Sequence, residues 1–247
     1  MNLNQLKRGG GPYFLPEIAL PESLRVLSLA PHPDDFDAIG VTLRWLNRRG
    51  HLIWVGVVSS GASGVEDGFV HPPSVEAKAA AREGEQRRSV QFFGLPESHL
   101  TFLRLREDRQ GHPVDDDENF DRLLRYYSDV RPDIVFLPHP NDPNEGHRRT
   151  HSLWRRCVTR AGSPALAAFN QDPKTLGMAP DLFTPFGEEE AAWKRSLLLF
   201  HQSQHQRNLN TRGYGFDERV LAMNRRAARE TLGREGYAEA FEIAARA

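Results

Sequence analysis

The sequence predicts an α/β fold in which helices cover both faces of a Rossmann-like, mostly parallel sheet. Three observations support this fold class. Short apolar runs alternate along the chain with segments whose apolar residues have helical spacing. Near the start, a strand, a helix and a second strand fit within about 35 residues, the size of a βαβ unit with parallel strands. No linker interrupts the 247 residues, so we expect a single domain.

The first elements follow from these patterns. Residues 24–30 and 52–58 are apolar runs typical of buried parallel strands, and residues 38–49 between them have apolar side chains at helical spacing. Residues 75–93 predict a long helix. Gly94 is expected to end it, because glycine readily adopts the left-handed conformation that follows many helices.

The same alternation extends to residue 161 and then weakens. We expect a strand over 100–105, a helix over 118–130, a strand over 133–137 and a helix over 147–161. Residues 162–186 are rich in proline, glycine and alanine, so they are expected to be irregular. Two further helices are expected over 188–200 and 216–232, while the pattern at 237–243 is ambiguous.

Composition limits the function classes. The chain has 32 basic and 33 acidic residues and a formal net charge of -1, which argues against a nucleic-acid-binding or membrane-surface protein. No run approaches the roughly 18 apolar residues that a membrane span needs, and no secretory-type apolar region follows the N-terminus. We therefore expect a cytoplasmic protein. Its single cysteine, Cys157, cannot form an intramolecular disulfide and is expected to be a core residue.

The N-terminal residues 1–22 differ from the rest of the chain. They lack a clear strand or helix pattern and contain three consecutive glycines followed by Pro12. We therefore expect an N-terminal surface arm at 1–22, followed by the folded domain at 23–247.

Polar residues that can bind a metal follow two of the predicted strands. His32, Asp34 and Asp35 come directly after the first strand. The residues after the strand at 133–137 include His139, Asn141, Asp142, Asn144 and His147. Ligands of open parallel sheets bind beyond the carboxyl ends of the strands. The two groups would therefore form one site if their strands are neighbours.

Together, the two groups suit a catalytic zinc ion. Histidine nitrogen and carboxylate oxygen are zinc ligands, and a catalytic zinc keeps three protein ligands and one open position for water. His32, Asp35 and His147 would supply the three ligands. Asp34, which projects differently from its neighbour, would accept a proton from the water.

Each group also has an interpretation without a metal. Proline and aspartate form turns, and an aspartate in the first group would then cap the next helix. His147 and His151 are four residues apart, which also fits a pair of histidines on one helical face. A nucleotide-binding turn is disfavoured, because no G-x-G-x-x-G follows the first strand and Asp34 and Asp35 would repel a pyrophosphate.

With both groups in place, the sequence resembles the PIG-L/LmbE-type N-deacetylase family. Pro31-His32-Pro33-Asp34-Asp35-Phe36 is similar to the first motif of that family, in which Ala-His-Pro-Asp-Asp-Glu follows the first strand. Residues 144–151 (NEGHRRTH) are similar to its second motif, and His147 matches the metal-binding histidine. Weaker matches follow in the order of the family: residues 59–64 (SSGASG), Arg82-x-x-Glu85, His201-Gln202-Ser203-Gln204 and residues 237–241 (YAEAF).

The resemblance implies a metal-dependent hydrolase that removes an N-acyl group, expected to be acetyl, from an amino-sugar or sugar conjugate. The implied roles are Zn²⁺ ligands for His32, Asp35 and His147, general base for Asp34, oxyanion stabilisation for His201 and Asn144, and substrate binding for Arg82. Two histidines and an aspartate also suit other divalent ions. The expected partner is a small N-acyl sugar, with no nucleic acid and no membrane span, and homo-oligomerisation is left open.

Three residues depart from the family's motifs. Phe36 replaces a glutamate, Asn144 stands where many members carry a histidine thought to stabilise the oxyanion, and Gly146 stands where they carry its partner aspartate. These changes weaken the expected oxyanion machinery. They keep open a non-catalytic sugar- or metal-binding protein on the same fold. An amidase acting on a larger thiol- or antibiotic-type conjugate is a second alternative, because substrate choice depends on loops such as residues 62–74 and 162–186.

Further polar residues lie near these motifs. Asp37 is expected to stabilise the N-terminus of the following helix through the helix dipole. Asp142 suits either the support of a metal ligand or a turn. The sequence does not assign a role to His139 or His151.

Overall fold

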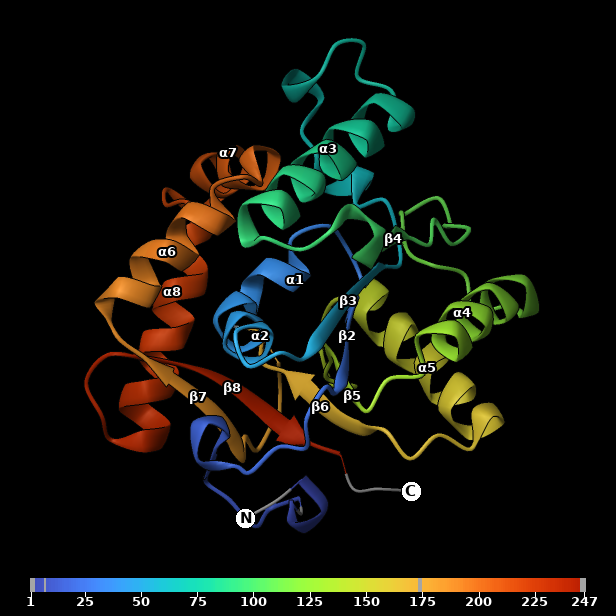
Figure 1. Cartoon of the computed structure of the whole chain (residues 1–247). Helices are drawn as coiled ribbons and strands as arrows, with labels where there is room; N and C mark the ends of the chain where they lie inside the picture. The colour runs from blue at the N-terminus through green and yellow to red at the C-terminus, as the bar shows by residue number, and fades with distance from the viewer. Residues whose placement is uncertain (1–2, 7, 173–174, 245–247) are drawn as a thin grey trace.

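The computed structural model describes residues 3–6, 8–172 and 175–244. In this part of the chain, eight strands form one mixed sheet in the order β1-β7-β8-β6-β5-β2-β3-β4, with helices around it (Figure 1). The strands are Tyr13–Phe14 (β1), Arg25–Ala30 (β2), Leu52–Val57 (β3), Leu100–Phe102 (β4), Ile134–Pro138 (β5), Leu166–Asn170 (β6), Leu182–Phe186 (β7) and Tyr237–Ile243 (β8). The predicted α/β fold class is confirmed.

The helices lie mainly between consecutive strands. They are Asp35–Ala38 (α1), Gly40–Asn47 (α2), Val75–Phe93 (α3), Asp117–Val130 (α4), Glu145–Ala161 (α5), Glu188–Leu198 (α6), Gln202–Arg212 (α7) and Phe216–Arg226 (α8). The long helix α3 has the predicted bounds. It begins because the Ser74 side chain accepts a hydrogen bond from the Ala77 N–H, and it ends at Gly94, whose φ is 93°.

The strand order brings the two metal-binding segments together. β2 pairs in parallel with β3 on one side and with β5 on the other, and β5 pairs in parallel with β6. The chain therefore leaves β2 and β5 at the same edge of the sheet. This adjacency is what a single site built from both polar groups requires.

Two hydrophobic layers hold helices on opposite faces of the sheet. On β2, Val26 contributes to a core shared with α1, α2, α3 and α6, whereas its neighbour Leu27 contributes to a core shared with α4 and α5. This alternation follows from successive strand side chains pointing to opposite faces. Cys157, on α5, is fully buried in the second layer, as predicted.

The C-terminal third differs from the sequence-based expectation. The segment 162–186, predicted to be irregular, contains β6 and β7. The ambiguous segment 237–243 is β8, which runs antiparallel between β6 and β7. The predicted helix at 188–200 ends at Leu198 and is followed by α7, which the sequence did not predict. The last predicted helix ends at Arg226 and continues as a π-helical turn over Ala227–Thr231.

Two expectations at the N-terminal side also change. Part of the predicted surface arm belongs to the fold, because β1 pairs in parallel with β7 and both Leu15 and Ile18 are buried. The predicted helix at 38–49 divides at Ile39 into α1 and α2. The domain boundary near residue 23 stays a prediction. None of the described helices is long and apolar enough to cross a membrane.

Candidate metal centre

The turn after β2 presents the first polar group. β2 ends at Ala30 and α1 begins at Asp35, so only four residues connect them. Asp34 lies in this turn with a φ of 109°, a left-handed conformation that costs a non-glycine residue roughly 1–3 kcal/mol. The Asp34 N–H donates to Gln86 Oε1 at 3.0 Å, which holds the turn against α3. Backbone strain of this kind is typical of functional sites.

Three side chains from the two segments converge on a common point. One ligand atom from each of His32, Asp35 and His147 lies within 4.8 Å of the others. Asp35 Oδ2 is 3.4 Å from His32 Nδ1 and 3.6 Å from His147 Nε2. The structure thus brings together the three residues that the sequence predicted to be ligands.

The donor set fits a divalent metal such as zinc. His147 donates from Nδ1 to Asp142 Oδ2 at 2.8 Å, which fixes the ring and leaves Nε2 facing Asp35. A carboxylate behind a ligating histidine is a common arrangement in zinc sites. Asp142 also accepts a hydrogen bond from the Asn144 N–H at 2.8 Å, so it both supports His147 and closes the turn before α5.

The charges in the triad favour the ionised form of the Asp35 carboxylate, which is the form that binds a metal. Burial opposes ionisation of Asp35, but His147 and His32 outweigh it and lower the pKa of Asp35. Burial likewise opposes protonation of His147, but Asp35 and Asp142 together raise its pKa to about 9.

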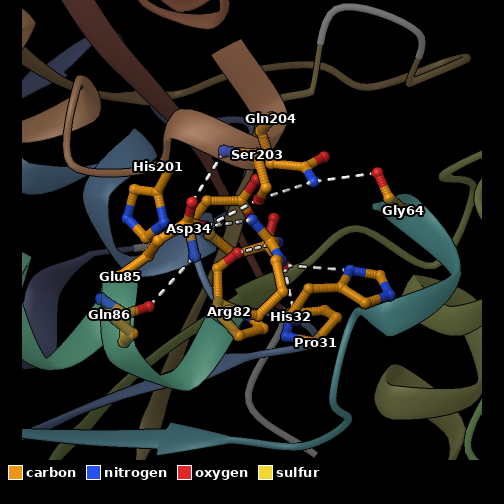
Figure 2. A network of polar contacts seen from close by, with 12 residues as sticks. Pro31, His32, Asp34, Gly64, Arg82, Glu85, Gln86, His201, Ser203 and Gln204 are labelled. Atoms are coloured by element: carbon orange, nitrogen blue, oxygen red, sulfur yellow. Dashed lines mark hydrogen bonds and ion pairs between the residues drawn. The ribbon is translucent and has the colours of Figure 1, made fainter. Parts of the chain in front are cut away.

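Asp34 lies beside the triad without belonging to it. Its carboxylate is 3.1 Å from Arg82 NH2, and Figure 2 shows Asp34 among Arg82, Gln86 and His201. Burial raises the pKa of Asp34, and the nearby Arg82 guanidinium opposes this rise. A buried carboxylate with a raised pKa holds a transferred proton better than an exposed one, as a general base requires.

Arg82 is part of the wall behind Asp34. Its side chain is only 2% exposed, and it also donates to the Pro33 carbonyl and lies 3.7 Å from Glu85 Oε2. Its Nε and NH1 atoms are buried and have no hydrogen-bond partner in the described part of the chain. The predicted substrate-binding role of Arg82 stays a prediction.

His201 lies on the other side of Asp34 and is fully buried. Its Nε2 donates to Asp37 Oδ2 at 2.7 Å, and its Nδ1 is buried without a hydrogen-bond partner among the described residues. Asp37 also accepts from Gln86 Nε2 at 2.9 Å. Asp37 lies in the first turn of α1, where a carboxylate was predicted to serve the helix terminus, and its carboxylate also binds two buried side chains.

Asn144 forms the N-cap of α5. Its Oδ1 accepts a hydrogen bond from the Gly146 N–H at 2.9 Å, and the residue is exposed at the edge of the site. No hydrogen bond of its amide nitrogen is found within the described ranges, so Nδ2 is available to a ligand. The oxyanion role predicted for Asn144 and His201 stays a prediction.

The two histidines that the sequence left open lie behind the site. His151 is buried against Trp154 and Phe169, its Nδ1 lies 3.2 Å from the Pro138 carbonyl, and burial lowers its pKa to about 4. His139 Nδ1 accepts from the Asn141 N–H at 3.0 Å. Both residues therefore pack and shape the end of β5.

Three of the four weaker sequence motifs meet around Asp34. The Glu85 carboxylate accepts hydrogen bonds from the Ser203 N–H and hydroxyl, both at 2.7 Å, and Gln204 Nε2 donates to the Gly64 carbonyl at 3.1 Å (Figure 2). Three segments that are distant in sequence thereby form one polar wall. Gln86, which contacts both Asp34 and Asp37, was missed because a glutamine inside a polar helix gives no sequence signal.

A cavity of about 560 Å³ opens above these residues. Its floor includes the triad and Asp34, and its outer wall comes from α7 and α8. The sequence did not predict α7, and it did not single out His112, which also lines the cavity. His112 lies in the loop before α4, away from every motif, so its position depends on tertiary structure.

Comparison with known proteins agrees with this geometry. Residues 27–158 match the model of the PIG-L family, described as GlcNAc-PI de-N-acetylase. The diacetylchitobiose deacetylase of Thermococcus kodakarensis is 29% identical over 160 residues, which cover 63% of this chain and 56% of that protein. The chain therefore matches a little over half the length of this relative.

Solved structures share the fold. The N,N'-diacetylchitobiose deacetylase of Pyrococcus horikoshii, solved with an inhibitor, superposes with a TM-score of 0.72 and 21% identity, covering 89% of this chain and 83% of that one. GalB, the 4-carboxy-2-hydroxymuconate hydratase of Pseudomonas putida KT2440, gives a TM-score of 0.69 and 18% identity, covering 90% and 96%. At these identities the likeness concerns the fold alone, and the fold carries more than one reaction.

Proposed function

The chain belongs to the PIG-L family, and from this membership and the site geometry we propose that it is a metal-dependent hydrolase that removes an N-acetyl group from an amino-sugar conjugate. One observation carries the proposal. His32, Asp35 and His147 converge at the floor of a cavity, and a fourth acidic residue, Asp34, lies beside them outside the ligand set. This arrangement leaves metal binding to the three convergent residues and proton transfer to Asp34.

The proposed reaction is hydrolysis of the acetamide. When bound, a divalent ion such as zinc supplies a Lewis acid for the amide carbonyl and lowers the pKa of water at its open position. Asp34 accepts a proton as the water oxygen bonds to the carbonyl carbon. Asp34 then returns this proton to the amine nitrogen as the C–N bond breaks, which gives acetate and the free amine.

Further residues stabilise the charges that develop during the proposed reaction. Arg82 is 3.1 Å from Asp34 and keeps its carboxylate available for proton transfer. We assign stabilisation of the oxyanion to the Asn144 amide, which lies at the cavity edge, and to the His201 ring beside Asp34. The Asn144 Nδ2 group makes no hydrogen bond among the described residues and can donate directly. His201 Nε2 already donates to Asp37, so His201 would donate to the oxyanion from Nδ1 with both ring nitrogens protonated.

The polar lining of the cavity favours a sugar as the substrate. It carries the carboxamides of Asn170, Gln171, Gln204 and Asn208, which donate and accept hydrogen bonds as sugar hydroxyls do. Asn170 Oδ1 is buried and has no hydrogen-bond partner in the described residues, so it offers an acceptor to a hydroxyl group. The relative named above acts on diacetylchitobiose, which is an N-acetylated sugar.

Asp34→Asn tests the division of labour. We expect the variant to bind zinc as the wild type does and to release acetate about 10²–10⁴-fold more slowly, because it lacks the general base. The substrates are N-acetylglucosamine, diacetylchitobiose and larger N-acyl conjugates, and zinc is measured by elemental analysis. Retention of both zinc and activity in Asp34→Asn would contradict the mechanism.

The same assay separates the alternatives. Activity only on the larger conjugates favours the amidase alternative. A wild-type protein that binds zinc and releases acetate from none of the substrates favours a non-catalytic binding protein.

A further inference from the structure

A small hairpin formed by residues 106–114 carries His112 to the cavity. The Val114 N–H donates to the Arg106 carbonyl at 2.9 Å, and the Asp108 N–H donates to the His112 carbonyl at 2.8 Å. In return, the His112 N–H donates to Asp108 Oδ1 at 3.1 Å. These bonds fix the backbone of His112 at the tip of the hairpin.

The 106–114 hairpin is held on both sides by elements of the site. The Glu107 carboxylate accepts hydrogen bonds from the Ser60 N–H at 2.6 Å and the Ser60 hydroxyl at 3.1 Å. On the other side, Arg149 on α5 donates to Asp108 Oδ2 at 2.7 Å. His112 is therefore placed firmly between the loop after β3 and the first turns of α5.

Gly146 leaves a gap that His112 and His32 share. A Cβ atom on Gly146 would lie 3.2 Å from His32 Nε2 and 3.3 Å from His112 Nδ1, so both nitrogens border the space that a side chain at 146 would fill. His112 Nδ1 is buried and has no hydrogen-bond partner in the part of the chain that is described. An enclosed nitrogen of this kind needs a partner, because burying it without one costs about 1–3 kcal/mol.

His32 needs a partner at the same place. Its Nδ1 faces Asp35 Oδ2 at 3.4 Å, and its Nε2 borders the space beside Gly146. When Nδ1 binds a metal, Nε2 carries the proton and becomes a donor. Metal-binding histidines nearly always donate this second N–H to an acceptor. His147 has Asp142 for this purpose, whereas no acceptor is bonded to His32 Nε2 within the described residues.

We propose that His112 is a positioning residue for the metal centre: its Nδ1 accepts a hydrogen bond from His32 Nε2 and orients that ligand. Gly146 permits this pairing because it places no side chain between the two rings. His112 acts through His32 rather than as a ligand itself, since the described group of convergent ligand atoms comprises only His32, Asp35 and His147. The inference rests on the metal site of the proposed function.

The test measures zinc affinity of the full-length apo-protein by competition with a chelator, without reference to activity. Asn places its amide oxygen near the position of a histidine Nδ1, whereas Gln places its polar group near Nε2 and Leu has none. We expect His112→Leu and His112→Gln to bind zinc about 10–100-fold more weakly than the wild type. His112→Asn should stay near the wild-type affinity, and so should His71→Gln, a control at an exposed histidine.

Thermal unfolding of each apo-protein excludes a general loss of structure, because a positioning role leaves the apo-protein as stable as the wild type. Gly146→Ala adds a second measurement: its Cβ would separate the two rings, so its effect on zinc affinity should not add to that of His112→Leu.

The inference would be overturned if His112→Leu bound zinc as tightly as the wild type, or if His112→Asn and His112→Gln lost equal zinc affinity. It would also be overturned if the effects of Gly146→Ala and His112→Leu on zinc affinity were additive. A wild-type protein without zinc binding would overturn the proposed function together with it.

Discussion

The two parts of the sheet contribute differently to the site. Strands β2 to β5 are mutually parallel where they pair. The three convergent ligand residues come from the turn after β2, the start of α1 and the first turn of α5. The C-terminal part, from β6 to β8, includes an antiparallel strand and contributes no residue to that described triad. It contributes buried polar side chains that hold a ligand-bearing segment. Part of the support for the ligands is therefore encoded in a different stretch of the chain from the ligands themselves.

Lys194 shows how this support works. Its ammonium group is fully buried and donates to Glu239 Oε1 at 2.6 Å, to Asn224 Oδ1 at 2.7 Å and to the Ala38 carbonyl at 2.6 Å. Ala38 is the last residue of α1, and Asp35 is the first. A cation from α6 thus fixes the short helix that begins with a predicted metal ligand.

The largest effect is expected from a ligand in the first part. His147→Ala removes one of three ligands, so zinc should be lost and acetate release should fall by at least about 10³-fold, equivalent to several kcal/mol. Elemental analysis and an acetate assay measure both. The stability of the apo-protein should change much less. Zinc retained at wild-type affinity would show that the triad is not the metal site.

A support residue should instead affect the fold. Lys194→Met leaves Glu239, which is 1% exposed, without its buried cation, and we expect a loss of about 3–5 kcal/mol in the free energy of unfolding. Urea denaturation measures this loss. The double variant Lys194→Met/Glu239→Gln is the control and should recover part of the stability. A loss below about 1 kcal/mol would show that the pair does not stabilise the fold.

The variant His151→Gln tests whether the part of the chain from β2 to α5, which carries the proposed ligands, also stabilises the fold. Burial lowers the pKa of His151 from 6.5 to about 4, so the folded state favours the neutral ring. The stability that this provides is present above pH 6.5 and is lost as the pH falls towards 4. The shift corresponds to roughly 3 kcal/mol at most. Denaturation at pH 6.5 and 4.5 should show a smaller drop for His151→Gln than for the wild type, and an equal drop would contradict the assignment.

The smallest effect is expected at the contact between α7 and α3. Ser203→Ala removes the hydroxyl that donates to Glu85 at 2.7 Å, and Glu85 keeps its bond from the Ser203 N–H. We expect a loss of about 1–2 kcal/mol in stability and unchanged zinc content. Ser196→Ala, at an exposed serine of α6, is the matched control and should have little effect. A change in zinc content would place Ser203 closer to the metal than the structure does.

The sequence predicted the first part of the fold well, because its elements have strong local signals. β2, β3 and β5 are continuous apolar runs, and α3 has both a serine cap and a terminal glycine. The convergence of His32, Asp35 and His147 was predictable for the same reason, since each polar group follows such a strand. Their proximity required only that the two strands be neighbours.

The second part was harder to predict, because its polar residues are buried. β8 contains Glu239 and Glu242, each 1% exposed, and two buried acids hide the pattern of an interior strand. α7 reads QSQHQRNLNTR, which has no apolar stripe. Its buried positions are polar, as at Ser203 and Asn208. Ser203 donates to Glu85 on α3, whereas Asn208 bonds to Gln204 and Arg212 within α7. Only tertiary structure identifies such contacts.

The contact between Glu239 and α2 also has a consequence for the order of events during synthesis. Glu239 accepts hydrogen bonds from the Val41 and Thr42 N–H groups, which precede it by 198 and 197 residues. Because a nascent chain emerges from its N-terminus, all three ligand residues leave the ribosome long before β8 exists. During that interval the first turn of α2 lacks its carboxylate and Lys194 lacks its counter-ion. The segment that carries His32 and Asp35 therefore gains this support only after the last strand has docked, so we expect completion of the proposed metal site to be a late step of folding.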